Sequence, residues 1–157
     1  MDEPNVREAA SEDLPAISAL WRSLQEYHLS LGLAFPLEQD ASEKWISSFQ
    51  RTLGRFSFLW VGLDRDQVSA FLLARVKQSP AYLGGLQIGE ISDLFVADNL
   101  RGSGIGTRLA ETAVSRLRSL GVHSIEVQIQ SGNDAGLAFW HKLGFKTDLT
   151  LVRKLAE

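Results

Sequence analysis

Residues 101–107 read Arg-Gly-Ser-Gly-Ile-Gly-Thr, a turn whose composition could bind an anion. Its three alternating glycines let the backbone approach a ligand closely. If a helix begins within this turn, the N–H groups of its first turn lack partners and point at the anion, and the helix dipole adds partial positive charge. Arg101 and Arg108 add formal charge on either side. The turn therefore predicts a phosphate or pyrophosphate site.

Four interpretations of this turn compete. A Walker A loop needs a lysine that this segment lacks. A dinucleotide fingerprint needs glycine where the chain has Thr107, although Glu126 lies near the distance expected of a ribose-binding acid. The turn could also hold the pyrophosphate of coenzyme A, or it could be a tight connection that binds nothing.

The elements around the turn place it in one βαβ unit. Apolar and β-branched residues predict a strand over residues 87–97, before the turn. Apolar residues at helical spacing predict an amphipathic helix over residues 105–120, after it. Alternating apolar and polar residues predict the next strand over 122–130, and the crossover between the two parallel strands should be right-handed.

The remaining segments complete the order β-α-α-β-β-β-α-β-α-β. Strands are predicted at residues 6–9, 56–63 and 68–76, helices at 11–31, 40–53 and 134–143, and one or two closing strands at 145–154. This order predicts an α/β (α+β) fold with a mixed sheet and helices against it.

The composition fits one domain over residues 1–157. A net charge of −3 argues against nucleic-acid binding through a global basic field, and the lack of cysteine excludes a thiol catalyst or a disulfide scaffold. The three histidines are scattered, so no metal site is predicted. Residues 1–4 are acidic and no stretch is long enough to span a membrane, so we expect a cytoplasmic protein.

Two blocks resemble the GNAT family of N-acetyltransferases. Residues 91–96, Ile-Ser-Asp-Leu-Phe-Val, and then 101–106 are similar to the acetyl-CoA signature of that family. Asn133 and residues 138–145, which contain Ala-Phe-Trp and Leu-Gly-Phe, look like its second conserved segment. The blocks begin 32 residues apart (133 minus 101), which leaves room for one helix and one strand. The resemblance implies a mostly antiparallel sheet with a central splayed βαβ cleft for acetyl-CoA.

The resemblance also implies a set of cofactor contacts. The backbone of residues 94–96 would pair with the pantetheine arm, and the N–H groups of 102–107 would hold the pyrophosphate. Asn133 would reach the cofactor from the other wall. The implied cofactor-binding residues are Leu94, Phe95, Val96, Arg101, Gly102, Ser103, Gly104, Ile105, Gly106, Thr107, Asn133, Phe139, Trp140 and Lys142. Where this chain has Trp140, the family often has a tyrosine that protonates the departing thiolate, a role that an indole N–H cannot fill.

Amine acetylation needs a proton acceptor, because an alkyl amine with a pKa of about 10.4 is mostly protonated at neutral pH. The resemblance places Glu90 and Asp93 on the strand beside the thioester, with Glu90 slightly preferred. Ideal alternation would put these two carboxylates on opposite faces of the sheet, but a bulge between them would break that rule. Each acid could instead be a strand-end group that holds a nearby cation.

Tyr27 and His28 lie on the first predicted helix, which borders the acceptor site in the family. Either could contact the substrate, and His28 could instead be a packed or capping residue. The predicted function is transfer of an acetyl group from acetyl-CoA to a primary amine of a small molecule or peptide, in a possible homodimer. The alternative is a coenzyme A-binding module without catalysis, which the missing tyrosine suggests.

Overall fold

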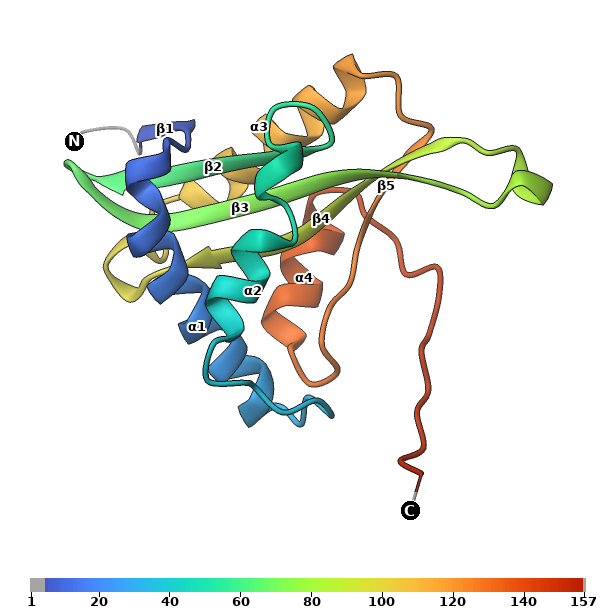
Figure 1. The fold of residues 1–157 in the computed structure, drawn as a ribbon, viewed down its shortest axis with the longest axis horizontal. Helices are drawn as coiled ribbons and strands as arrows, with labels where there is room; N and C mark the ends of the chain where they lie inside the picture. The colour runs from blue at the N-terminus through green and yellow to red at the C-terminus, as the bar shows by residue number, and fades with distance from the viewer. Residues whose placement is uncertain (1–4, 157) are drawn as a thin grey trace.

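The computed structural model describes residues 5–156 as a five-stranded sheet with helices on both faces (Figure 1). The strands are β1 (Asn5–Glu8), β2 (Ser57–Asp64), β3 (Gln67–Gln78), β4 (Gln87–Val96) and β5 (Ser124–Val127), in that order across the sheet. Neighbouring strands are antiparallel from β1 to β4, and β4 and β5 are parallel. The predicted mixed, mostly antiparallel sheet is confirmed. Residues 1–4, whose acidic character is one basis of the expectation of a cytoplasmic protein, lie outside the described residues.

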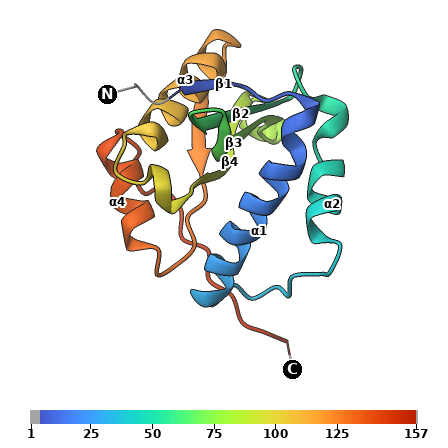
Figure 2. The same cartoon turned by 90° about the vertical axis from the view of Figure 1, so that its left-hand side faces the viewer.

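Within residues 5–156, four α-helices divide between the two faces of the sheet. They are α1 (Leu14–Ser30), α2 (Ala41–Ser47), α3 (Ile105–Ser119) and α4 (Asp134–Lys142). Figure 2 shows α1 and α2 on one side of the strands and α3 and α4 on the other. No helix within residues 5–156 is long and apolar enough to cross a membrane.

Each face of the sheet carries its own hydrophobic cluster. On the α3 face, Leu109, Ala113 and Leu117 are fully buried at helical spacing, which confirms the amphipathic pattern predicted for this helix. On the other face, the indole rings of Trp21 on α1 and Trp45 on α2 stack with centroids 5.0 Å apart. These contacts fix α1 firmly against the sheet, so side chains near its C-terminal end are held in place.

The strands β4 and β5 separate at the middle of β4. Their pairing runs from Ile88↔Ser124 to Ile91↔Val127, and β4 then continues alone on that side to Val96. The predicted splay between the two parallel strands is therefore present. It leaves the last five residues of β4 without a strand on the β5 side.

Several predicted elements are shorter than expected, and one is wrong. The helix predicted at 40–53 stops at Ser47 and is followed by a 3₁₀ turn at Gln50–Thr52. No strand forms at residues 145–156, although closing strands were predicted at 145–154. The chain leaves α4 through Gly144, whose φ is 94°, and runs away from the sheet (Figure 1). A strand-like sequence forms a strand only where a free sheet edge is within reach.

A partly buried ion pair, between exposed Arg7 and buried Asp13, joins β1 to the start of α1. Arg7 Nη1 lies 2.7 Å from Asp13 Oδ2, and the same carboxylate oxygen accepts a hydrogen bond of 2.7 Å from the backbone N–H of Ala10. The hydrogen bond from Arg7 holds the pKa of Asp13 below its usual range, although burial opposes it. Asp13 therefore contributes stability that is present above about pH 4, its unfolded pKa, and is lost as the pH falls through the lowered folded value.

We expect Asp13→Asn to lower the free energy of unfolding at neutral pH by about 1–3 kcal/mol, because it removes a charged acceptor from two donors. Urea unfolding measured between neutral and strongly acidic pH checks this. The difference between wild type and variant should shrink as the pH falls below about 4. A difference that stays constant across this range would show that the charge of Asp13 is not what stabilises the junction.

Candidate active site

A bulge in β4 decides which way the candidate acids face. Leu73 on β3 is opposite Asp93, but the next residue, Ala74, is opposite Ile91, so Ser92 is an extra residue on β4. Arg75, two residues after Leu73, is opposite Glu90. Glu90 and Asp93 therefore lie on the same face of the sheet, the face covered by α1 and α2. The sequence left this question open, and the bulge resolves it.

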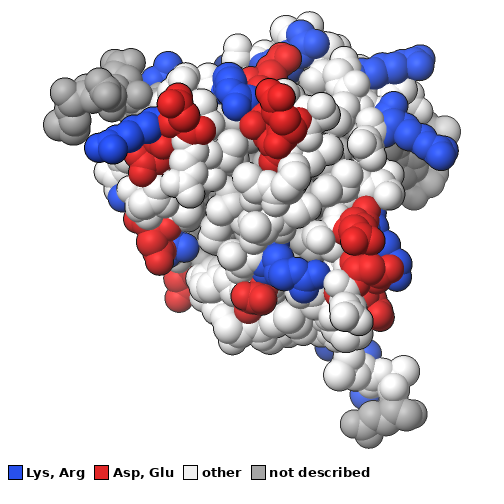
Figure 3. Space-filling view, turned by 60° about the vertical axis from the view of Figure 1, so that its left-hand side comes forward, with Lys and Arg blue, Asp and Glu red and all other residues white. Residues whose placement is uncertain are grey.

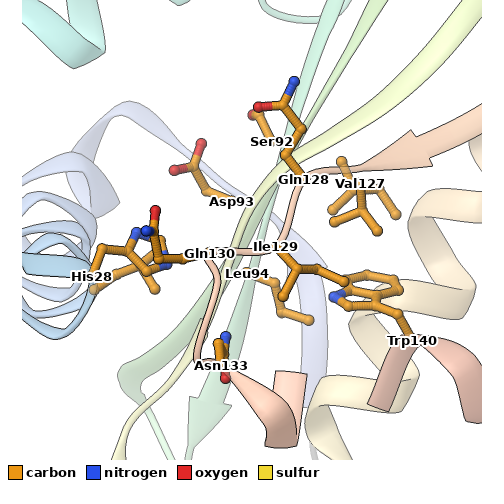
Figure 4. Close-up of a pocket in the computed structure, with 12 residues that line it drawn as sticks. His28, Ser92, Asp93, Leu94, Val127, Gln128, Ile129, Gln130, Asn133 and Trp140 are labelled. Carbon is orange, nitrogen blue, oxygen red and sulfur yellow. The ribbon is translucent and has the colours of Figure 1, made fainter. Parts of the chain in front are cut away.

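A cleft opens where β4 and β5 separate, between α1 and α4 (Figure 4). Figure 4 shows His28 and Asp93 on the α1 side and Trp140 on the α4 side. The residues that line the cleft are Leu24, His28, Ile91, Ser92, Asp93, Leu94, Val127, Gln128, Ile129, Gln130, Asn133 and Trp140. The cleft brings together residues from α1, β4, β5 and α4.

Asp93 lines this cleft in a poorly solvated environment. Burial raises the pKa of its carboxyl, and this effect outweighs hydrogen bonds from Ser92 and the Trp45 indole and the charge of Arg75, which lower it. The Trp21 indole also lowers the pKa of Asp93. Its own nitrogen is buried without a hydrogen-bond partner among the described residues. A carboxyl of this kind accepts a proton more readily than an exposed aspartate.

His28 faces the same cleft from the C-terminal half of α1. Burial lowers the pKa of its imidazole, so the side chain is neutral at pH 7. A neutral imidazole has one nitrogen free to accept a proton or a hydrogen bond. The structure thus places two proton acceptors, His28 and Asp93, along one wall.

Glu90 lies outside the cleft lining. Its Oε2 is 2.8 Å from Lys77 Nζ, and Lys77 also forms an ion pair with Glu126 on β5. Lys77 thus joins β3, β4 and β5 on the α1 face. Of the two interpretations open for Glu90, this geometry favours an acid that holds a nearby cation.

Asn133 lies at the mouth of the cleft and caps α4. Its Oδ1 accepts a hydrogen bond of 3.0 Å from the backbone N–H of Gly136, and the hydroxyl of Tyr27 donates to the same oxygen at 3.3 Å. Tyr27 therefore connects α1 to α4 across the cleft. The Nδ2 group of Asn133 remains available as a donor.

The glycine-rich turn lies between β4 and α3, as predicted. Gly102 and Gly104 have φ values of 78° and 86°, in the left-handed region, and a Cβ at either would meet open space. Gly104 is the N-cap of α3, so the first N–H groups of that helix face outward beside it. Ser103 Oγ donates to the Leu100 carbonyl at 2.5 Å, and Arg101 Nε donates to the Val96 carbonyl at 3.2 Å. The N–H groups of Ser103 and Ile105 are also engaged, by the Leu100 carbonyl and by Ser103 Oγ, which fixes the shape of the turn. The N–H groups of Gly106 and Thr107 at the start of α3 stay open.

The wall of α4 is aromatic. Trp140 is buried and packs edge-on against Phe139 and Phe145, with ring centroids 5.0 and 5.1 Å away. A Cβ placed on Gly106 would lie 3.6 Å from the Phe139 ring and from Val96, so the turn sits directly against this wall. Trp140 shapes this wall of the cleft, and its indole cannot act as the acid that protonates the thiolate. Lys142, at the end of α4, is exposed.

The structure brings together most of the predicted site and adds residues that the sequence analysis missed. Gln128 and Gln130 follow β5 and face the cleft, and Ser92 supplies the bulge. The alternating polar residues after Ile125 could have indicated the two glutamines. A bulge between Glu90 and Asp93 was considered in the sequence analysis, but no residue pattern places it at Ser92. Within residues 5–156, no three His, Asp or Glu side chains are grouped to hold a metal ion.

Comparison with known proteins explains this arrangement. Residues 17–145 match the sequence profile of the acetyltransferase (GNAT) family. The chain belongs to this family. An L-methionine sulfoximine/L-methionine sulfone acetyltransferase of Pseudomonas aeruginosa is 36% identical over 143 residues, which cover 90% of this chain and 80% of that protein. The N-alpha-acetyltransferase 30 of Schizosaccharomyces pombe is 28% identical over 88 residues, and this chain spans 57% of its length.

Solved structures show the same fold. A protein of Bacillus halodurans superimposes with a TM-score of 0.82 at 23% identity, over 97% of this chain and 99% of its own. The GNAT assignment confirms the family, the fold and the acetyl-CoA cofactor expected from the sequence. It makes the chain an acetyltransferase that acts on an amine, and nothing in these relatives favours a module without catalysis.

Proposed function

We propose that this chain is a single N-acetyltransferase domain over residues 1–157, and that it acetylates the primary amine of a small molecule with Asp93 as the proton acceptor. The observation that carries the proposal is the position of β4. One end of its unpaired segment holds Asp93 in the cleft, and the other end leads into the glycine-rich turn at 101–107. A ligand that binds along this segment would place a reacting group near the carboxylate.

The residues present fit acetyl-CoA. Backbone groups of residues 94–96 have no strand on the β5 side and could bond a pantetheine arm, as a further strand would. The open N–H groups at the start of α3 suit a pyrophosphate, and Asn133 could donate its amide N–H to the cofactor. When bound, acetyl-CoA supplies the thioester that the amine attacks.

The protein groups then have distinct roles. Asp93 takes the proton from the acceptor ammonium, directly or through water, so that the neutral amine can attack. Tyr27 and His28 line the acceptor side, where neutral His28 can accept a hydrogen bond. No side-chain acid is required at Trp140, because a thiolate whose conjugate acid has a pKa of about 8.5 is a tolerable leaving group.

The acceptor that the relatives favour is an amino acid or a close analogue. The Pseudomonas relative is named for methionine sulfoximine and methionine sulfone, and it matches nine tenths of this chain. The fission yeast relative, named as an N-alpha-acetyltransferase, matches 56% of it. A small α-amine is thus our first candidate and a peptide α-amine the second. Both would bring a cation to the carboxylate of Asp93.

The protein's surroundings are also part of the proposal. We place it in the cytoplasm, where acetyl-CoA is available, as a homodimer that does not bind nucleic acid. Figure 3 shows acidic and basic side chains interspersed around one face, and the net charge of the chain is −3. A surface of mixed sign gives little attraction to a phosphate backbone.

The test is release of free thiol from acetyl-CoA in the presence of single amines. The panel should include methionine sulfone, methionine sulfoximine, unmodified amino acids and short peptides. Turnover with an amino acid or its analogue supports the proposal. Turnover with peptides alone would replace the proposed acceptor class, and stabilisation of the protein by acetyl-CoA without turnover on any amine would contradict catalysis.

The lowered pKa of His28 predicts a pH dependence of stability. Its folded pKa lies below the unfolded value of about 6.5, so its contribution is present above that pH and is lost as the pH falls through the folded value. We expect the free energy of unfolding of His28→Gln to fall less than that of wild type between about pH 7 and pH 5. Urea unfolding measures this. His123→Gln, an exposed position outside the cleft, is the matched control and should follow wild type.

A further inference from the structure

The first residue of α3 packs on a glycine of β2. A Cβ added to Gly62 would lie 2.5 Å from Ile105 Cδ1 and 3.0 Å from Ile105 Cγ1. It would also lie 3.0 Å from the Cβ of Ala70, the residue opposite Gly62 on β3. Ile105 and Ala70 are fully buried in the cluster on the α3 face, so neither can move without displacing its neighbours. The missing side chain at Gly62 therefore sets how closely the start of α3 approaches the sheet.

A bulge in the β2–β3 hairpin holds the segment that leads into the glycine-rich turn. The register of the two strands shifts after Gly62, and Ser69 is the extra residue on β3. The Ser69 carbonyl accepts a hydrogen bond of 2.8 Å from the backbone N–H of Ala97, directly after β4. The Nδ2 group of Asn99 donates to Ser69 Oγ at 3.1 Å and to Asp64 Oδ2 at 2.7 Å. The end of the hairpin thus binds the chain just before the turn.

These contacts fix the glycine-rich turn from both of its ends. Residues 101–104 lie between Asn99 and Ile105, and the end of the β2–β3 hairpin contacts both of those residues. Figure 1 shows the segment that follows β4 at the same end of the sheet as the turn of this hairpin. We call the three hairpin residues that make these contacts the hairpin seat: Gly62, Asp64 and Ser69. None of the three is among the residues that line the cleft.

We propose that the hairpin seat positions the open N–H groups at the start of α3 for the pyrophosphate of acetyl-CoA. The inference rests on the proposed function, which places the cofactor at this helix end. An N–H group binds an oxygen atom well only within about 2.7–3.2 Å and at a nearly straight angle. A small displacement of the first turn of α3 therefore weakens binding. Gly62 and Asn99 are positioning residues, because they act through the turn and from outside the cleft lining.

Gly62→Ala tests the contact between the seat and α3. The added methyl group requires Ile105 to move by about 1 Å, from 2.5 Å to an ordinary contact of about 3.5 Å. We expect the dissociation constant of acetyl-CoA to rise at least about tenfold, as for the loss of one hydrogen bond to a charged phosphate. Calorimetric titration with acetyl-CoA or desulfo-CoA measures this change without any turnover.

Gly89→Ala is the matched control, because it disturbs the packing of the other end of the same helix. A Cβ at Gly89 on β4 would lie 2.9 Å from Leu117 Cδ1 and 3.2 Å from Leu117 Cδ2, near the C-terminal end of α3. Thermal unfolding without ligand should show a loss of stability in both variants. The control should change the dissociation constant of acetyl-CoA by less than about threefold. Similar losses of affinity at the two ends would mean that α3 acts through its general packing, and would overturn the proposal.

Asn99 tests the other end of the turn, and its side chain is exposed, so its variants should fold. Asn99→Asp sets a second carboxylate against Asp64 in place of the 2.7 Å hydrogen bond, and should raise the dissociation constant of acetyl-CoA at least about fivefold. Adding Asp64→Asn restores a donor, an acceptor and the net charge of the chain. This double variant should return to within about threefold of wild type. If it does not recover, the added charge and not the lost contact weakens binding, which would overturn the proposal.

Gly104→Ala, inside the turn, separates this inference from the proposed function. Loss of affinity in Gly104→Ala, with Gly62→Ala and Asn99→Asp binding acetyl-CoA as wild type does, would keep the cofactor at the turn and overturn the hairpin seat. Wild-type affinity in all three variants would mean that the cofactor does not lie at the start of α3, and would overturn both proposals. Loss of affinity in all three, with Gly89→Ala unchanged, supports both. If Gly62→Ala fails to fold, the recovery of the Asn99 variant decides alone.

Discussion

Asp93→Asn should lower kcat for amine acetylation by about 10²- to 10⁴-fold, the usual contribution of a positioned general base. Asparagine keeps the size of the side chain and cannot take up the amine proton. Asp93 faces the cleft at the bulge, where burial raises the pKa of its carboxyl, and the unpaired segment of β4 begins beside it. Steady-state kinetics with a saturating amine measure the effect. The dissociation constant of acetyl-CoA should change little.

Glu90→Gln is the matched control for Asp93→Asn. It removes a carboxylate from the same strand and the same face, but from outside the cleft lining. Its loss breaks the 2.8 Å ion pair with Lys77, so we expect a modest loss of stability and a much smaller effect on kcat. If Glu90→Gln abolishes turnover while Asp93→Asn keeps it, the base is Glu90 and our assignment is wrong.

The pH dependence of kcat/KM distinguishes a proton acceptor at Asp93 from a residue with only a structural role. Asp93 must be deprotonated to act, and its pKa is raised. As the pH is lowered, kcat/KM should therefore begin to fall at a higher pH than it would with an ordinary aspartate as the base. The pH dependence of stability has the opposite direction to that of kcat/KM. A carboxyl whose folded pKa is raised contributes stability below its unfolded pKa and loses it as the pH rises through the folded value. Asp93→Asn should therefore be at least as stable as wild type at neutral pH while it is much less active.

Gly104→Ala should raise the dissociation constant of acetyl-CoA at least about tenfold. Gly104 adopts a φ of 86°, which costs an L-residue about 1–2 kcal/mol. Relaxation of this strain turns the N–H groups at the start of α3 away from their common direction. Loss of one hydrogen bond to a charged phosphate costs about 1.5–3 kcal/mol, or roughly tenfold or more in affinity. Calorimetric titration with acetyl-CoA or desulfo-CoA measures it.

Gly121→Ala is the control for the backbone strain itself. Gly121 follows the other end of α3, has a φ of 79°, and a Cβ there would also meet open space. The two variants should lose similar stability, but only Gly104→Ala should lose affinity for acetyl-CoA. Equal loss of affinity in both would show that the turn acts through the stability of α3 and not through its donors.

Local sequence determined the side of the site that we propose for the cofactor. The glycines of residues 101–107 specify a turn conformation without help from distant residues, and the spacing of Ile105, Leu109 and Ala113 specifies the helix that follows. The second block, at Asn133 and Phe139–Phe145, supplied the other wall, where Asn133 caps α4. These features involve residues a few positions apart, so they could be predicted from sequence alone.

The acceptor side depended on contacts between distant segments. Glu90 and Asp93 are equivalent candidates in the sequence, and only the bulge at Ser92 puts them on one face. Only the sheet brings Lys77 to Glu90 and leaves Asp93 in the cleft. The neutral state of His28 likewise arises from burial where α1 meets the strands. None of these positions follows from the residues themselves.

The tail shows the same division most plainly. The sequence by itself determined that residues 145–154 have strand-forming character, and the tertiary structure decided that no strand forms there within one chain. The physical reason is that a helix or a tight turn satisfies its hydrogen bonds locally, whereas a strand needs a second edge at the right distance. Composition cannot specify that edge. The fold must supply it.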